Sequence, residues 1–245
     1  MTKQVDNGGF KPLSTDIPRR LIWRSWGREK TGKNHLGLTA PGPIYGLYFD
    51  PGGLEGVAEK FVTEGKEIHT VQYRFNKKRN DQDDAKELKD RFLADYYEVA
   101  LKQARTIQID ETELWQVFRF AEWGRESAKG REYGPLNGEY RGLIQAAYDA
   151  GINLQLIQKV REVWEDDKPT GKMGPDGFKQ AGNIVQVNLE HSWERPEEGD
   201  FAEGFKVTVK ECRQNMAIAG DTYSNIDFKT LGLYVFPDST EDSWE

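Results

Sequence analysis

The chain has 245 residues and a formal net charge of −7, so it is long enough for one α/β domain and is not covered by positive charge, although a local basic groove could still bind a polyanion. The single cysteine, Cys212, excludes an internal disulfide, and the three scattered histidines lack companions at ligand spacing, which argues against a dedicated metal site. No run approaches the roughly 18 apolar residues of a membrane span and the N-terminus lacks an apolar secretory core, so we expect a cytoplasmic protein without a membrane partner.

The two ends of the chain differ from its middle in composition. Residues 1–19 are rich in Gly, Pro, Thr and Asp and predict a flexible N-terminal arm. Its apolar cluster could insert Phe10 into a neighbouring subunit for oligomerisation, or the arm could be an untethered tail. Residues 237–245 are acidic and predict a disordered tail that keeps the protein soluble. The domain itself is therefore expected over residues 20–236.

An apolar strand near Leu21 runs into the sequence Gly27-x-x-x-x-Gly32-Lys33, and a helix-like segment follows. Glycines let backbone N–H groups curl around an anion, and the next helix presents its positive N-terminus, so this order predicts a phosphate-binding loop. Lys33 would reach the β and γ phosphates. Asn34 stands where a Ser or Thr hydroxyl normally binds Mg²⁺, so the metal ligand at this position stays open.

The rest of the domain alternates between strand and helix patterns. The expected strands cover about 43–50, 68–75, 106–110, 152–157, 184–190 and 205–209, the last two forming a closing hairpin. Apolar residues recur every four positions from Leu88 to Ala100 and predict an amphipathic helix, and further helices are expected near 113–120 and 139–150. Residues 159–182 show no period and many polar, Gly and Pro residues, which predicts a functional loop.

Phosphoryl transfer needs a cradle for the phosphates, a carboxylate for Mg²⁺ and a residue that orients water. Asp110 ends an apolar strand after the phosphate loop, so it is placed to act as the metal carboxylate, although such a residue can also be a simple helix cap. The predicted nucleotide-binding residues are Gly27, Lys30, Thr31, Gly32, Lys33 and Asn34, and the predicted metal ligands are Asn34 and Asp110.

Several blocks of the sequence together resemble a known family. They are GREKTGKNHLGL, YGLYFDPGGLEG, TIQIDETELW, LIQKVR, GFKQAGNIVQVNLE and FKVTVKECRQN. Over about residues 20–228 the chain resembles the RecA-like recombinase ATPases, most closely the bacteriophage RecA-like ATPases associated with single-strand annealing. The resemblance implies a P-loop NTPase core of the α/β class, with a mostly parallel central sheet, helices on both faces and a C-terminal antiparallel hairpin.

The resemblance also implies roles for single residues. Gln158 would sense the γ-phosphate, and Lys210 and Arg213 would act across a subunit interface, although both cations could equally lie on an exposed strand face. The family's water-activating Glu falls on Gly52 here, which leaves Glu55 and Glu111 as substitutes. With Asn34 as a second departure, slow ATP hydrolysis is expected.

Two loops would contact single-stranded DNA if the resemblance holds. Cations along the backbone and an aromatic side chain for base stacking are what sequence-tolerant binding requires, although charged loops are commonly only solvated. The expected contacts are Arg119, Arg125, Lys129, Arg131 and Tyr133 in the first loop, and Lys159, Arg161, Trp164, Lys168, Lys172 and Lys179 in the second.

The sequence therefore predicts an ATP- and Mg²⁺-binding recombination protein that assembles with copies of itself on single-stranded DNA and promotes annealing or strand pairing. A single-strand-binding protein is a candidate partner. A second hypothesis, motivated by Asn34 and Gly52, is a nucleotide-dependent scaffold or assembly protein without significant turnover. A packaging motor or helicase loader is a third hypothesis, but no separate domain for such work is evident.

Overall fold

The computed structural model describes residues 19–50, 54, 56–74, 82–166, 168–195 and 204–244. The N-terminal arm with Phe10, together with Gly52 and Glu55, lies outside the described residues, so the roles expected for them stay predictions. Within these ranges, none of the helices combines the length and the apolar character needed to span a lipid bilayer.

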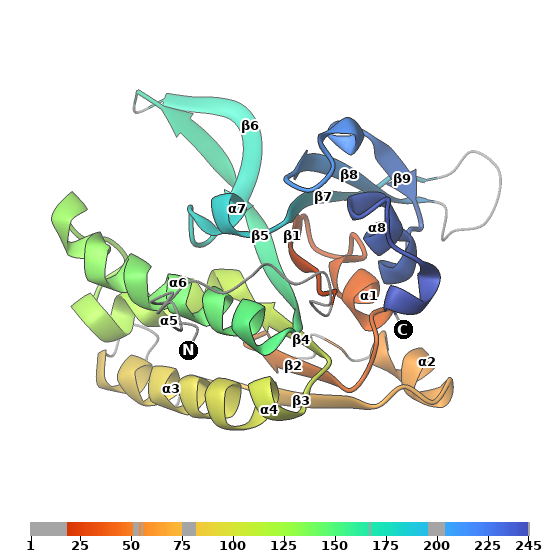
Figure 1. Cartoon of the computed structure of the whole chain (residues 1–245). Helices are drawn as coiled ribbons and strands as arrows, with labels where there is room; N and C mark the ends of the chain where they lie inside the picture. Colours follow the sequence, from red (N-terminus) through yellow and green to blue (C-terminus); the bar gives the residue numbers. More distant parts are fainter. Residues whose placement is uncertain are drawn as a thin grey trace, which may run out of the picture.

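A twisted sheet forms the centre of the molecule (Figure 1). Its neighbouring strands pair in parallel from β3 to β7, and β7, β8 and β9 pair antiparallel. In spatial order the strands are β3 (Ile68–Gln72), β2 (Ile44–Tyr48), β4 (Thr106–Asp110), β5 (Asn153–Glu165), β1 (Ile22–Gly27), β7 (Val187–Trp193), β8 (Phe205–Cys212) and β9 (Thr222–Ser224). The expected mostly parallel sheet and the antiparallel pairing of the late strands are confirmed.

Helices cover both faces of this sheet, as expected for an α/β fold (Figure 1). One face packs on α3 (Gln82–Ala94), the π-helix η1 (Asp95–Ala100), α4 (Leu101–Gln103), α5 (Glu111–Trp123), α6 (Tyr133–Ala150) and α7 (Ala181–Ile184), and the exposed 3-10 turn η2 (Gly130–Glu132) directly precedes α6. The opposite side carries α1 (Lys33–Leu38), α2 (Ala58–Thr63), the 3-10 turn η4 (Met216–Ile218), α8 (Phe228–Val235) and the 3-10 turn η5 (Glu241–Trp244).

The predicted amphipathic stripe forms the centre of the larger core. Leu88, Phe92, Tyr96 and Ala100 are all buried there, because their spacing keeps them on one side of α3 and η1. They pack there with buried residues of β4, β5, α5 and α6, and the burial of this apolar surface stabilises this face of the sheet.

Two segments differ from the sequence-based expectation. Most of the predicted loop over 159–182 is a β-hairpin, in which the second half of β5 pairs antiparallel with β6 (Lys168–Asp176) and projects from the body (Figure 1). The second difference is at the C-terminus, where Trp244 is only 3% exposed and its ring packs edge-on against Phe228 at 5.9 Å between centroids. Trp244 lies among acidic residues in the sequence, and its side chain covers the apolar face of α8. The described part of the tail is therefore folded.

Candidate functional site

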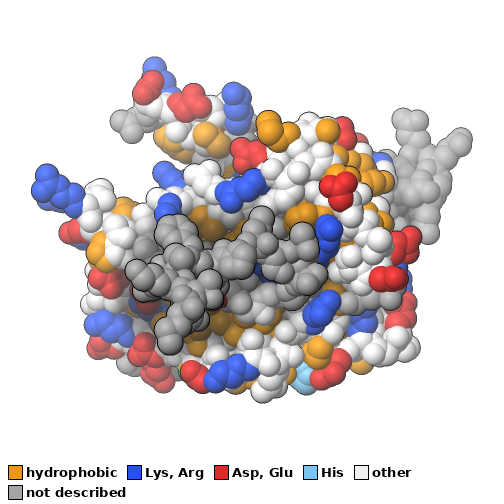
Figure 2. All heavy atoms as spheres, in the orientation of Figure 1, with side chains coloured by type: hydrophobic (Ala, Val, Ile, Leu, Met, Phe, Trp, Pro, Cys, Tyr) orange, Lys and Arg blue, Asp and Glu red, His pale blue; other side chains and the backbone are white. Residues whose placement is uncertain are grey.

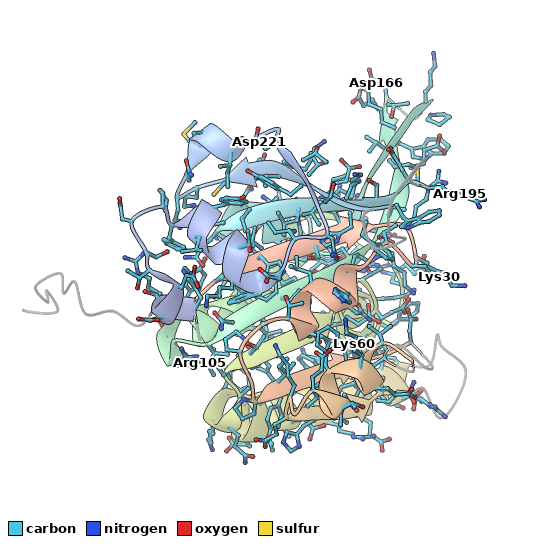
Figure 3. All side chains as sticks on the ribbon, turned by 90° about the vertical axis from the view of Figure 1, so that its right-hand side faces the viewer. Lys30, Lys60, Arg105, Asp166, Arg195 and Asp221 are labelled. Atoms are coloured by element: carbon cyan, nitrogen blue, oxygen red, sulfur yellow. The ribbon has the colours of Figure 1, made fainter. Side chains whose placement is uncertain are left out.

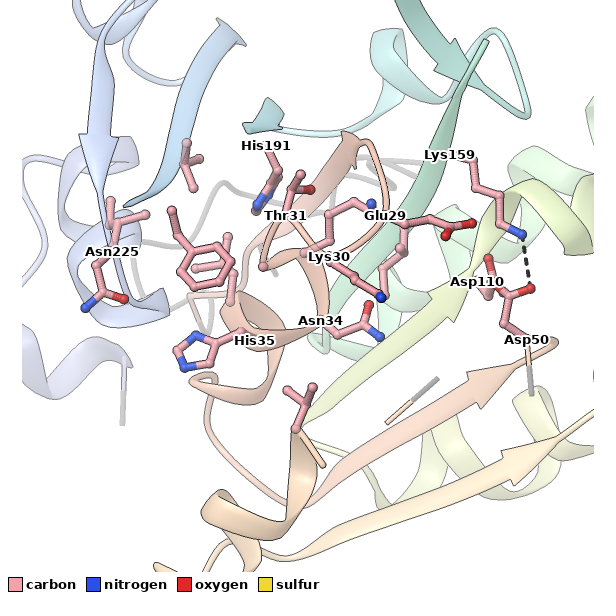
Figure 4. A pocket seen from close by; sticks show the side chains of 18 of the residues that line it. Glu29, Lys30, Thr31, Asn34, His35, Asp50, Asp110, Lys159, His191 and Asn225 are labelled. Carbon is pink, nitrogen blue, oxygen red and sulfur yellow. Dashed lines mark hydrogen bonds and ion pairs between the residues drawn. The ribbon is translucent and has the colours of Figure 1, made fainter. Parts of the chain in front are cut away.

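A pocket of about 570 Å³ opens where the carboxyl ends of β1, β2, β4 and β5 meet (Figure 4). Parallel strands bring these ends to one edge of the sheet, which is where ligands bind in open α/β folds. Figure 3 shows Lys30, in the loop after β1, on the same side of the molecule as Asp166 in the β5–β6 hairpin, and opposite Arg105, which precedes β4. The predicted phosphate loop therefore lines a real cavity at the expected edge.

The loop between β1 and α1 turns too tightly for ordinary residues. Gly27 has a φ of +156°, and a Cβ there would lie 2.2 Å from the carbonyl oxygen of His191. A side chain at this position would collide with the backbone of β7, so the turn requires glycine. Gly32, at φ +84°, directly precedes α1, and Lys30 also has a positive φ, +61°. The glycines that suggested a tight loop in the sequence thus stand at positions with positive φ.

The side chain of Lys33 folds back over the loop. Its Nζ donates hydrogen bonds to the carbonyl oxygens of Gly27, at 2.8 Å, and Arg28, at 2.6 Å. Burial lowers the pKa of Lys33 to about 8, while the carboxylate of Asp110 acts in the opposite direction. A half-buried ammonium group that donates to carbonyl oxygens gains from an anionic ligand, because a charge-assisted bond is stronger than one to a neutral acceptor. Lys30, Thr31, Gly32 and Asn34 line the same pocket.

Asp110 ends β4 inside this pocket and is buried. Burial raises the pKa of Asp110 to about 7, because it disfavours the charged form, and the nearby carboxylate of Asp50 adds to the increase by charge repulsion. Carboxylate and amide oxygens are ligands that Mg²⁺ accepts, so Asp110 and Asn34 fit a hydrated magnesium ion that also binds phosphate. The described ranges contain no group of three His, Cys, Asp or Glu side chains that could hold a metal ion without such help.

Lys159 and Asp50 were not expected in this pocket, and both line it. The Nζ of Lys159 lies 3.0 Å from Asp50 Oδ1 and 3.0 Å from Glu113 Oε1 (Figure 4 shows the pair with Asp50). The side chain of Lys159 therefore lies in the pocket beside Asp50, whereas the sequence analysis placed it in the second DNA-contacting loop. Strand order explains the difference, because β2, β4 and β5 are neighbours in space while their sequences are far apart.

Buried polar side chains form a floor beneath α1. Tyr48 donates to Gln108 at 2.6 Å, Gln108 donates to Gln155 at 2.7 Å, and Gln155 donates to Ser25 at 2.9 Å. Both glutamines also bond to the first residues of α1, since Gln155 Nε2 donates to the carbonyl oxygen of Lys33 at 2.9 Å and Gln108 Nε2 donates to that of Asn34 at 3.3 Å. Polar residues inside the apolar strands TIQID and NLQLIQ were a signal for this floor that the sequence analysis did not use.

The close approach of α1 to this floor depends on a further glycine. A Cβ at Gly37 would lie 1.9 Å from Gln108 Nε2 and 2.0 Å from Gln155 Oε1. At the far end of the floor, His191 Nε2 lies 3.0 Å from Ser25 Oγ, and burial lowers the pKa of His191 to about 3, with the Lys33 ammonium contributing. The imidazole is therefore neutral near pH 7, and the loop rests on a floor of neutral polar groups.

Glu111 and Gln158 lie on the other side of β5, and neither lines this pocket. Glu111 is fully buried, accepts a hydrogen bond from Gln158 Nε2, and accepts another from the Phe178 amide at 2.8 Å. Burial raises the pKa of Glu111 to about 7. The two residues join the start of α5 to the base of the hairpin, and their expected catalytic roles stay predictions.

Apart from Lys159, the predicted DNA contacts fall on two parts of the chain. Arg119, Arg125, Lys129, Arg131 and Tyr133 lie around the end of α5 and the start of α6, where Arg125 pairs with Glu132 at 3.0 Å. Arg161, Trp164, Lys168 and Lys172 lie on the hairpin, and Trp164 is 60% exposed. A second cavity of about 550 Å³ at the base of the hairpin is lined by Arg24, Arg161, Trp164, Phe178 and Lys179 among others.

Lys210 and Arg213 lie on and just after β8, outside the lining of the 570 Å³ pocket. Lys210 Nζ pairs with Glu190 at 3.0 Å, and Arg213 donates to the carbonyl oxygen of Asn183. Their proposed action on a neighbouring subunit stays a prediction. The opposite wall of the pocket instead receives Phe205, Val207, Asn225 and Ile226, none of which the sequence analysis identified.

No protein-family model and no curated protein matches this sequence. Among solved structures, the chain is similar to a KaiC-like protein from the hyperthermophilic archaeon Pyrococcus horikoshii, with 14% identity and a TM-score of 0.46 over 83% of this chain and 84% of that chain. It is also similar to the RadB recombinase, with 14% identity and a TM-score of 0.46 over 82% of this chain and 84% of that chain. Similarity at this level carries no information about ligand or activity.

Proposed function

We propose that the chain is a RecA-like P-loop ATPase, similar to those of bacteriophages, which assembles on single-stranded DNA and promotes annealing or strand pairing in recombination. One observation carries the nucleotide-binding part. Lys33 of the tight Gly27–Gly32 loop and Asp110 of β4 line the same pocket, at the carboxyl edge of a mostly parallel sheet. A cavity of about 570 Å³ falls within the range expected for a nucleotide-sized ligand.

In this proposal, different residues of the pocket bind the phosphates, the magnesium ion and the base of MgATP. Backbone N–H groups of the loop and the Lys33 ammonium bind the phosphates, and Asp110 with Asn34 would hold Mg²⁺, which supplies positive charge to the phosphate oxygens. Phe205 and Ile226 give the opposite wall an apolar surface suited to the base. Hydrolysis is slow in this proposal, because Asn34 replaces the usual hydroxyl ligand and Glu111 lies outside the pocket.

The hairpin supports the nucleic-acid part of the proposal. An exposed Trp164 can stack on a base, and Arg161, Lys168 and Lys172 can follow a phosphate backbone. Figure 2 shows the hairpin standing away from the body of the molecule, with both cationic and acidic side chains on it. The acidic side chains weaken the total positive field, so we expect moderate affinity that depends strongly on salt.

Self-assembly completes this proposal, with Lys210 and Arg213 facing a neighbouring subunit and with a single-strand-binding protein as a further partner in the cytoplasm. Asn34 also favours a second candidate function. In that alternative the protein binds nucleotide without significant turnover and serves as a scaffold whose assembly responds to ATP.

Binding of unstructured oligonucleotides tests the proposal. We expect DNA binding that weakens with salt and that ATP strengthens. In Lys33→Ala the effect of ATP should be lost, so that the variant binds DNA equally with and without ATP. A filter-binding series at decreasing salt measures this. Failure to retain oligonucleotide even at low salt would remove the DNA part. ATP-dependent assembly without phosphate release would instead favour the scaffold.

A further inference from the structure

Lys159 occupies the point at which β5 leaves the parallel sheet. Successive side chains of a strand point to opposite faces, so Gln158 and Lys159 serve different surroundings. Gln158 is buried beside Glu111, whereas Lys159 lines the 570 Å³ pocket. The pocket therefore receives an ammonium group from β5 in addition to that of Lys33.

The side chain of Lys159 is held in this direction. Its backbone amide donates to Thr112 Oγ1 at 2.9 Å, and its Nζ lies 3.0 Å from both Asp50 Oδ1 and Glu113 Oε1. Only 32% of the side chain is exposed. An ammonium group has three donors, and these two carboxylates engage two of them. Little conformational entropy remains to be lost when a ligand reaches this group.

The position of Lys159 along the pocket indicates which part of a nucleotide it would meet. In Figure 4, Lys159, Asp50 and Asp110 lie at one end, Asn225 and His35 lie at the other, and the loop residues lie between them. A nucleotide whose phosphate chain follows the loop places its base toward Asn225. Its last phosphate then lies at the end occupied by Lys159.

We propose that Lys159 contacts the terminal phosphate of a bound nucleoside triphosphate from within the same subunit, and thereby distinguishes triphosphate from diphosphate. This inference rests on the proposed function, since it requires nucleotide in this pocket. Among the described residues, the Lys and Arg side chains that line the pocket are Lys30, Lys33 and Lys159. Lys30 and Lys33 belong to the loop, which both nucleotides would occupy, whereas Lys159 lies beyond it.

The charges around Lys159 allow its ammonium group to exchange the Asp50 carboxylate for a phosphate. Without ligand, Asp50 and Glu113 neutralise its ammonium group. In a magnesium–triphosphate complex, the cation would attract the carboxylates. The phosphate oxygens would attract the Lys159 ammonium group. Charge-assisted bonds to phosphate can therefore replace the bond to Asp50 without leaving a buried charge unpaired.

Equilibrium binding of two nucleotides tests this inference. The affinities of AMP-PNP, a non-hydrolysable ATP analogue, and of ADP are measured with Mg²⁺ by calorimetry for the full-length wild type, Lys159→Met and Glu113→Gln. Methionine keeps the length of the side chain and removes its charge. Glu113→Gln weakens the same ion-pair cluster but leaves the ammonium group, and Glu113 does not line the pocket.

We expect Lys159→Met to bind AMP-PNP roughly tenfold more weakly and ADP as well as the wild type does. Glu113→Gln keeps the wild-type ratio of the two affinities. Equal losses for both nucleotides, or no loss for either, would overturn the inference while leaving the proposed function intact. Wild-type protein that binds neither nucleotide would overturn the proposed function itself, and the inference with it.

Discussion

The pocket and the hairpin are two regions built from one strand and stabilised in different ways. The first half of β5, Asn153–Gln158, is buried in the parallel sheet and carries the floor of the pocket. The second half, from Lys159 to Glu165, is partly or fully exposed, and among the described strands its ladder partner is β6. The comparison indicates that the pocket depends on buried hydrogen bonds, whereas the hairpin can change its surface without disturbing the fold.

The largest expected effect comes from breaking the pocket floor. Gln155→Leu should lower the free energy of unfolding by about 3 kcal/mol, because Gln108, Ser25 and the Lys33 carbonyl group would lose a buried partner. Thr170→Val removes two hydrogen bonds of the hairpin, from Thr170 Oγ1 to the Val163 carbonyl oxygen at 2.8 Å and from the Lys172 amide to Thr170 Oγ1 at 3.2 Å. Because water can replace partners at this partly exposed site, the change should cost only about 1 kcal/mol. Urea denaturation measures both, and equal costs would contradict the comparison.

A substitution on the exposed surface of the hairpin should change DNA binding more than it changes stability. Trp164→Ala should change the free energy of unfolding by less than about 0.5 kcal/mol, because the side chain is 60% exposed. Loss of a stacking surface should weaken single-stranded DNA binding roughly tenfold. Met216→Ala, which truncates a side chain that is 82% exposed on η4, is the matched control. A similar loss of DNA binding in both variants would assign Trp164 no special role.

A smaller effect concerns acid stability of the pocket floor. The folded-state pKa of His191 is about 3, below its ordinary value of 6.5, so the folded protein binds fewer protons than the unfolded chain between these values. The stability that this difference contributes is fully present above about pH 6.5 and is lost as pH falls toward 3. His191→Gln should therefore show a shallower decrease in the urea midpoint between pH 7 and 5 than the wild type. Parallel decreases would exclude a neutral buried imidazole.

The sequence predicted the elements whose cause is local. The Gly27–Gly32 loop and Asp110 were found because a tight turn needs glycine and because a carboxylate ends an apolar strand. The meeting of Lys159 with Asp50 was not predictable, since it depends on the spatial order of β2, β4 and β5.

The hairpin was missed for a different reason. Its strand β6, KPTGKMGPD, contains Gly and Pro in place of alternating apolar residues, because neither face of it packs on the core. Patterns of apolar residues identify strands only where burial imposes the pattern. The folded C-terminus was missed likewise, because the single buried Trp244 is surrounded by acidic residues in the sequence.

The central claim is that the 570 Å³ pocket binds MgATP with the help of Lys33. Calorimetric titration of the wild type and Lys33→Ala with MgATP tests this claim most directly. Lys33 lines the pocket at the first position of α1, and Lys172→Ala on the hairpin serves as a charge-matched control. The account predicts saturable binding by the wild type and by Lys172→Ala, and a loss of at least roughly a hundredfold in Lys33→Ala. Equal binding by all three proteins, or binding by none of them, would contradict it.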